Sequence, residues 1–190
     1  MPTIDQLILT PYFQGDPLFP PRLARSCVAR TRAGKNPLVI LHDGGEEVTR
    51  FLESKGYDTE QPVGLTDEDH IEIDRLVRGE NRRITAMLND EGVAATGMMP
   101  DDRGIMALAD GGVRVLRIER IANLVSTKVH VVIGNSFSRG LAVPKQIATE
   151  ALCLAVEDVI SSGMCLRLVQ RAQPRSDRIR ELTVADLVDI

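Results

Sequence analysis

The segment with the clearest capacity for chemistry is His42-Asp43-Gly44-Gly45, which follows the apolar run 38–41 and precedes a helical pattern. Glycines at a strand-to-helix turn let a ligand approach the backbone, and unpaired N–H groups at a helix start can hold an anion. The same glycines can serve a tight turn, because glycine adopts dihedral angles that other residues avoid. Both interpretations stay open here. The motifs Gly-x-Gly-x-x-Gly and Gly-x-x-x-x-Gly-Lys are absent, so neither a dinucleotide fingerprint nor a Walker loop is predicted.

The other polar candidates have simpler structural interpretations. The histidines His42, His70 and His130 share no ligand spacing, so no metal site is predicted. His70 is expected in solvent on a charged helix, and His130 in the core of a strand. The acidic residues within 67–74 are typical of a helix start with a solvated face. The arginines within 78–83 are expected to pair along a helix or, alternatively, to bind an anion.

Composition excludes several classes of protein. The chain has 190 residues, 43% apolar and 26% charged, as in an ordinary globular protein. A net charge of −4 and 3% aromatic residues argue against nucleic-acid binding, which needs positive charge and stacking surfaces. No apolar run approaches the roughly 20 residues that span a membrane, and the start lacks a signal-peptide pattern. Three cysteines without a Cys-x-x-Cys pair indicate reduced thiols, so a cytoplasmic protein is expected.

Apolar periodicity predicts alternating strands and helices. The predicted fold class is α/β: a three-layer αβα sandwich with a mainly parallel sheet and a β-hairpin insertion. The strands are expected at 4–9, 38–41, 93–96, 129–133 and 164–169, and the hairpin arms at 105–109 and 113–118. The helices are expected around 23–34, from Gly45 to Gly56, from Thr66 to Gly79, as a separate segment after Gly79, from about Lys145 to Ser162, and from Thr183; residues 135–140 are expected to be a polar loop.

Several segments between Leu38 and Gly97 follow one another in a familiar order. His42-Asp43-Gly44-Gly45 is similar to a strand ending in His-Gly-Gly-Gly, and Gly64-Leu65-Thr66-Asp67 to Gly-Leu-Arg-x-Thr-Asp. The stretch from Gly79-Glu80-Asn81-Arg82 to Gly92 is similar to Gly-Lys-x-Asn-x-x-Leu-x-x-Leu-Leu-Asn. In this order the chain resembles the amino-acid kinase family, most closely its N-acetylglutamate kinase branch. The likeness extends from about Ile4 to Ile190.

The resemblance implies a site at which an acyl-amino acid lies beside ATP and Mg. In the family a carboxylate attacks the γ-phosphoryl group, and two lysines and the amides of the glycine turn neutralise the transferring charge. The resemblance places substrate contacts at Gly44 and Gly45. Asn81 and Lys145 are candidate anion-binding residues.

The sequence departs from the family's pattern where catalysis needs charge. Residues 9–15 (Leu-Thr-Pro-Tyr-Phe-Gln-Gly) stand where the family has a lysine and a glycine pair, and the arginine of the Gly-Leu-Arg stretch is missing. Residues 143–147 stand in place of Asn-x-Asn-Ala-Asp, which puts Ile147 at the position of the catalytic aspartate. We expect a single domain over 1–190 that lacks the C-terminal part of the family's nucleotide-binding region. Each lost donor or cation lowers the rate of phosphoryl transfer by about 10²–10³. Several losses together would leave little catalysis, so no catalytic residue is predicted.

These departures predict a catalytically degenerate, N-acetylglutamate-kinase-like protein. It would bind an acidic small molecule such as an N-acyl-amino acid, or a partner chain, in or near amino-acid (arginine-type) biosynthesis. One alternative is an active kinase that phosphorylates the carboxylate of an acyl-amino acid with ATP, completed by another subunit. Another is a structural or regulatory subunit without a ligand. A homodimer or a kinase partner subunit is expected, without nucleic acid or membrane.

Overall fold

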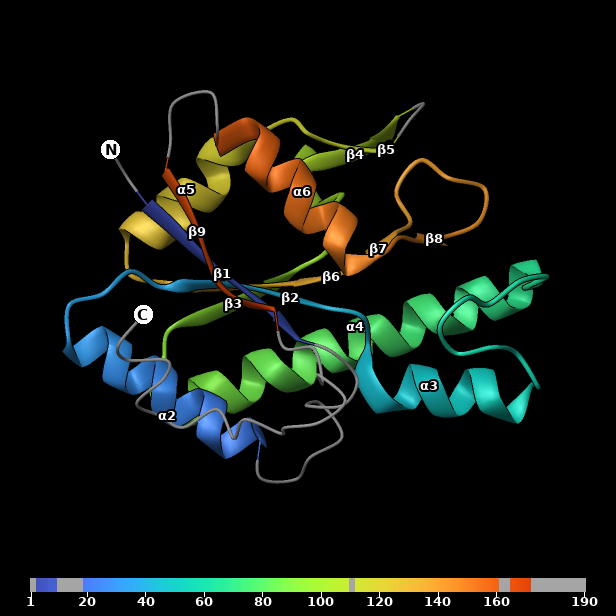
Figure 1. The fold of residues 1–190 in the computed structure, drawn as a ribbon, viewed down its shortest axis with the longest axis horizontal. Helices are drawn as coiled ribbons and strands as arrows, with labels where there is room; N and C mark the ends of the chain where they lie inside the picture. Colours follow the sequence, from blue (N-terminus) through green and yellow to red (C-terminus); the bar gives the residue numbers. More distant parts are fainter. Residues whose placement is uncertain (1–2, 10–18, 110–111, 161–164, 172–190) are drawn as a thin grey trace.

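The computed structural model describes residues 3–9, 19–109, 112–160 and 165–171. Its centre is a five-stranded sheet in which the strands follow the order β3-β6-β2-β1-β9 and every neighbouring pair is parallel (Figure 1). β2 and β6 are buried along their whole length, as expected for strands covered on both faces. The five strands are β1 (Thr3–Leu9), β2 (Leu38–His42), β3 (Ala95–Met98), β6 (His130–Gly134) and β9 (Cys165–Arg171).

Helices cover both faces of the sheet and complete three layers (Figure 1). On one face lie α5 (Ile118–Ser126) and α6 (Thr149–Ile160); on the other lie α2 (Phe19–Arg32) and α4 (Asp67–Asp90), with α3 (Gly45–Ser54) beside α4. Val39 and Leu41 of β2 belong to the core under α5 and α6, whereas Leu38 and Ile40 belong to the core under α2 and α4. The predicted α/β sandwich with a parallel sheet is confirmed. The predicted hairpin is also present, as β4 (Met106–Ala109) and β5 (Gly112–Val115).

Helix α4 begins where the sequence predicts it and continues further than predicted. Thr66 accepts a hydrogen bond from the backbone N–H of Asp69, and the Asp69 carboxylate accepts one from the N–H of Thr66, a complete capping box. The predicted break at Gly79 is wrong, because α4 runs through this residue to Asp90. A glycine inside a helix costs only about 1 kcal/mol. Packing of Val77 and Ile84, buried on either side of it, is sufficient to offset that cost.

The structure differs from the prediction in four other places. The strand placed at 93–96 lies two residues further on, as β3. Helix α5 was not predicted. Residues 135–140 are not simply a loop, because β7 (Ser136–Phe137) pairs antiparallel with β8 (Lys145–Gln146). α6 accordingly begins at Thr149 and not at Lys145. Residues 145–146 form backbone hydrogen bonds with β7 in an antiparallel ladder, so the helix begins only after them.

Some predictions concern residues outside the described part of the chain. They are the hairpin turn at 110–111, the departure at residues 10–15, the end of the long helix at 161–162 and the helix from Thr183. Within the described part, no helix is both long enough and apolar enough to cross a membrane.

Two histidines are buried in the central strands. The Leu38 N–H donates to His130 Nδ1 at 3.1 Å, which confirms His130 as a core histidine. Burial, with a smaller contribution from the charge of Arg30, lowers the pKa of His130 to about 4. Burial and the charge of Arg83 lower the pKa of His42 to about 3. Both side chains are therefore neutral in the folded protein at neutral pH.

The two neutral histidines should make stability depend on pH. In the unfolded chain each titrates near its ordinary pKa of 6.5, so below that pH the unfolded state binds more protons than the folded state. The free energy of unfolding should therefore be highest above about pH 6.5 and fall as the pH drops towards 4. Each histidine contributes up to about 1.4 kcal/mol per pH unit. Urea unfolding between about pH 7.5 and pH 5 measures this slope.

Matched variants assign the slope to the buried rings. His130→Asn keeps an acceptor for the Leu38 N–H but removes one titrating group, so it should lose about half of the slope. His70→Asn leaves both buried histidines in place and should retain it. A free energy of unfolding that does not change across this pH range would contradict the assignment.

Candidate functional site

The carboxyl ends of the parallel strands bring four chain segments to one edge of the sheet. His42, at the end of β2, is in register with Leu9 of β1 and with Gly134 of β6. Met98, at the end of β3, is in register with Ile133. Ligands of open α/β sheets bind outside this edge. The glycine turn therefore lies where a ligand of such a fold would be expected.

The amides of the glycine turn are used within the turn itself. Gly44 and Gly45 adopt positive φ angles of 91° and 66°, and α3 begins at Gly45. The Gly44 N–H donates to His42 Nδ1 at 3.2 Å, and the Gly45 N–H donates to the Asp43 carboxylate at 3.0 Å. Both N–H groups therefore have acceptors within the turn, and substrate contact at Gly44 and Gly45 stays a prediction.

Close packing gives a second reason for glycine at this edge. A Cβ atom on Gly44 would lie 2.6 Å from Val48 Cγ2 and 2.9 Å from Val77 Cγ2. A Cβ atom on Gly134 would lie 2.6 Å from Val77 Cγ1. Val77 is fully buried and fills the space between the ends of β2 and β6. The structural interpretation of the glycine turn is sufficient to explain Gly44.

Asn81 connects α4 to two strands. Its Nδ2 donates to the carbonyl oxygen of Val132 at 3.0 Å and to that of Met98 at 3.3 Å, and lies 3.2 Å from His42 Nε2. The side chain is buried, and both amide hydrogens have backbone acceptors. Anion binding by Asn81 stays a prediction. The observed role of this side chain is to fasten α4 to the sheet.

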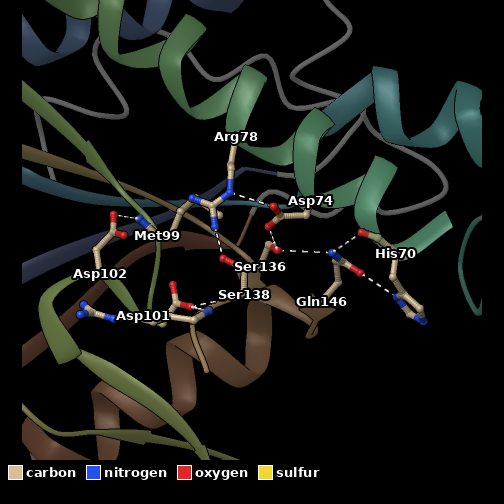
Figure 2. A network of polar contacts seen from close by, with 10 residues as sticks. His70, Asp74, Arg78, Met99, Asp101, Asp102, Ser136, Ser138 and Gln146 are labelled. Atoms are coloured by element: carbon tan, nitrogen blue, oxygen red, sulfur yellow. Dashed lines mark hydrogen bonds and ion pairs between the residues drawn. The ribbon is translucent and has the colours of Figure 1, made fainter. Parts of the chain in front are cut away.

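A polar network joins α4 to the segment that follows β6 (Figure 2). Ser136 Oγ donates to the Asp74 carboxylate, and Gln146 Nε2 donates to Ser136 Oγ at 3.3 Å. Gln146 Oε1 lies 3.1 Å from His70 Nδ1. The expectation that His70 is simply solvated is wrong, because the ring is half-buried and contacts the side chain of Gln146.

The network continues through Arg78 to the segment after β3 (Figure 2). Arg78 Nε donates to Asp74 at 2.8 Å, the pairing along the helix that was expected, and its Nη2 donates to Ser138 Oγ. The backbone N–H groups of Ser138 and Arg139 both donate to the Asp101 carboxylate, which is buried. Hydrogen bonds between side chains and backbone thereby connect α4, the segment after β3 and the segment after β6.

The two residues singled out near the start of α6 have different surroundings. Lys145 is exposed and its backbone pairs with Phe137; its anion-binding role stays a prediction. Ile147 packs against the core under α5 and α6, and its backbone exchanges hydrogen bonds with Asn135. An apolar, packed side chain therefore stands at the place where the resemblance puts a catalytic aspartate.

The sequence did not predict that the residues of this network contact one another. Its members come from α4, from the segment after β3 and from β7 and β8, and no fixed spacing connects them. The one usable signal is the position of Asp101, just beyond the carboxyl end of a strand, where functional side chains gather in α/β folds. Among the described residues, no three His, Cys, Asp or Glu side chains are grouped so that they could hold a metal ion.

Comparison with known proteins gives partial matches in sequence and broad matches in fold. No protein-family profile matches the chain. The acetylglutamate kinase of Acinetobacter baumannii is 32% identical over 95 residues, which are 48% of this chain and 31% of the relative. That of Petrotoga mobilis is 34% identical over 95 residues, with the same coverage. The matched part thus spans about a third of the length of these curated relatives.

Solved structures match most of the described chain. An isopentenyl phosphate kinase matches with a TM-score of 0.58 and 16% identity over 84% of this chain and 69% of its own. The aspartate kinase of Synechocystis matches with a TM-score of 0.59 and 12% identity over 87% of this chain and 28% of its own. Identities this low show the fold alone. Together with the sequence matches, they confirm the predicted resemblance: the protein has an amino-acid-kinase-like fold, and about half of its sequence is similar to acetylglutamate kinases.

Proposed function

We propose that this protein is a catalytically degenerate relative of the acetylglutamate kinases that binds an acidic small molecule, of the N-acyl-amino acid class, or a partner chain. The observation that carries the proposal is the glycine turn, where the N–H groups of Gly44 and Gly45 donate to His42 and Asp43. Transfer of a phosphoryl group depends on positioned donors and cations that meet the developing negative charge. Donors that are already bonded within the chain cannot meet it.

The charges near the turn also support the proposal. Asp43, Asp74 and Asp101 place carboxylates at the carboxyl edge, and the Arg78 guanidinium is bonded to Asp74 and Ser138. His42 is neutral, because burial lowers its pKa to about 3. A nucleotide triphosphate brought to this edge would meet carboxylates, with the guanidinium of the network already engaged.

Lysine is scarce where the family needs it. The sequence has only four lysines, and the first of them is Lys35, far beyond the position at the end of β1 where the resemblance expects one. Lys55 lies 3.4 Å from the Asp69 carboxylate and over the ring of Phe51, at the far end of α3 from the glycine turn. Loss of these cations would remove most of the acceleration of phosphoryl transfer, since each is worth about 10²–10³ in rate.

Two further parts of the proposal follow from the resemblance. A place in or near arginine-type amino-acid biosynthesis is the setting in which an acetylglutamate-kinase-like protein would act. Self-association, or association with a kinase subunit, is the expected assembly. The competing function is an active carboxylate kinase with ATP and Mg, which the partial match to acetylglutamate kinases favours.

A coupled kinase assay decides between the degenerate and the active protein. With N-acetylglutamate and MgATP the purified chain should turn over at least about 10⁴-fold more slowly than the acetylglutamate kinase of Acinetobacter baumannii in the same assay, because several donors and cations are lost together. Turnover within tenfold of that enzyme, abolished by Lys145→Ala, would contradict the proposal. The Lys145→Ala variant tests the remaining candidate cation directly.

The close packing around Gly44 should make a side chain at this position costly. Gly44→Ala should destabilise the protein by about 1–2 kcal/mol for a left-handed backbone and by a further 1–3 kcal/mol, roughly, for the overlap with Val48 and Val77. Gly56→Ala is the matched control, because its φ of 77° is similar and no atom lies within 4 Å of an added Cβ. Urea unfolding of both variants measures the difference. Equal destabilisation would show that packing does not require glycine at position 44.

A further inference from the structure

A hollow of about 740 Å³ lies away from the glycine turn, at the edge of the sheet formed by β3. It is bounded by β3, by the short 3₁₀ helix η1 (Asp102–Gly104) and by α5. A smaller hollow of about 510 Å³ shares three of its residues, Arg103, Arg120 and Arg139. We call this region the arginine hollow, after these three side chains. Its volume is in the range of sites for small molecules.

The three arginines reach the hollow from three separate segments. Arg103 belongs to η1 and Arg120 to α5, whereas Arg139 follows β7. They are 17 and 19 positions apart in the sequence, which is why no motif reveals them. The fold alone brings them together.

Helix α5 is placed so that one side faces the core and another faces the hollow. Ile121 and Val125 are buried under the sheet. Arg120, Asn123, Leu124 and Thr127 follow the i, i+3, i+4, i+7 spacing of a single helix face and line the hollow. The packing of the apolar face therefore fixes the direction of Arg120.

Asp101 fixes the segment that carries Arg139. Its buried carboxylate accepts the backbone N–H groups of Ser138 and Arg139, as part of the network in Figure 2. Asp102 accepts the backbone N–H of Met99 at 2.8 Å and so holds the chain that leads into Arg103. Two neighbouring aspartates thus anchor the backbone of two of the three arginines.

The guanidinium groups of the hollow differ in one respect from three guanidinium groups of α4. Arg75, Arg78 and Arg83 are each paired with a carboxylate of their own helix. Among the described residues, none forms an ion pair or a hydrogen bond with the guanidinium groups of Arg103, Arg120 or Arg139. Among the described residues that line the hollow, Asp102 has the only carboxylate, so three guanidinium groups and one carboxylate give the lining a net charge of +2. Like charges that converge without a partner are stabilised by a bound anion.

We propose that the arginine hollow binds the dianionic phosphate group of a small organic phosphate monoester. The planar fork of a guanidinium fits phosphate oxygens in a bidentate manner, and the charge of the lining matches a phosphate dianion. Met98, Ile105 and Leu124 line the same hollow and offer apolar contact to the organic part of the ligand. The site is separate from the glycine turn and needs no catalysis there. This proposal depends on the proposed function in one respect only, namely that the ligand is expected to be acidic.

Isothermal titration calorimetry with glycerol 3-phosphate, at constant ionic strength, tests the proposal. We expect saturable binding by the intact chain, and an affinity at least tenfold lower in Arg120→Gln and in Arg139→Gln, because each loses a charge-assisted contact with phosphate. Arg75→Gln removes an exposed arginine that is paired on α4 and should bind within twofold of the unmodified protein. Arg139 is exposed, so its variant decides the outcome if Arg120→Gln fails to fold.

Further probes separate the classes of ligand. Inorganic phosphate should compete with glycerol 3-phosphate, and glycerol should not. Succinate that binds as tightly as glycerol 3-phosphate would overturn the assignment to phosphate, and an RNA oligonucleotide that binds more tightly would overturn the assignment to a small molecule. Absence of binding, or equal loss in Arg75→Gln, would overturn the site itself. Turnover in the kinase assay would contradict the degenerate function and leave the arginine hollow intact.

Discussion

The close approach of α4 to the carboxyl edge of the sheet is the constraint on which the rest of the structure depends. Val77 fills the space between Gly44 and Gly134, and Asn81 bonds to the backbones of β3 and β6. The helix can lie this close only because the facing residues have no side chain. An added methyl group at either glycine would overlap Val77, and cores relieve such overlap only by backbone shifts.

This approach also determines what the carboxyl edge can do. Once α4 is in place, Asp74, Arg78 and His70 bond to side chains of the chain that follows β6 (Figure 2). The polar groups at this edge are directed at one another. A buried polar group is costly unless it is bonded, so a network of this kind stabilises the closed arrangement. Any ligand at the glycine turn would have to displace Asp43 and His42 from their amides.

The sequence predicts those parts of the fold that local chemistry determines. The fully apolar run 38–41 predicted β2 as a strand buried on both faces, the pattern of 129–133 predicted most of β6 as a strand, and the acidic helix start after Thr66 predicted the start of α4. The errors arise where long-range packing overrides local signals. Gly79 does not end α4, because buried neighbours hold the helix together. Residues 145–146 form a strand only because β7 lies beside them.

The candidate site was predictable in part. The glycine turn was found from its position between a strand and a helix, but its two interpretations could be separated only by the hydrogen bonds of Gly44 and Gly45. The partners of Ser136, Ser138 and Asp101 come from distant segments, so their spacing carries no signal. The arginine hollow was missed for the same reason. Convergence of charge in space is a property of the fold and not of any short motif.

The central claim is that the amides of the glycine turn stay bonded to His42 and Asp43 and are not available to stabilise a transferring phosphoryl group. The most direct measurement is the amide ¹H and ¹⁵N chemical shifts of Gly44 and Gly45 during a titration with N-acetylglutamate in the presence of MgATP. The account predicts that both resonances stay in place throughout the titration. A saturable shift of both amides would show that the ligand takes the positions of His42 and Asp43, and would contradict it.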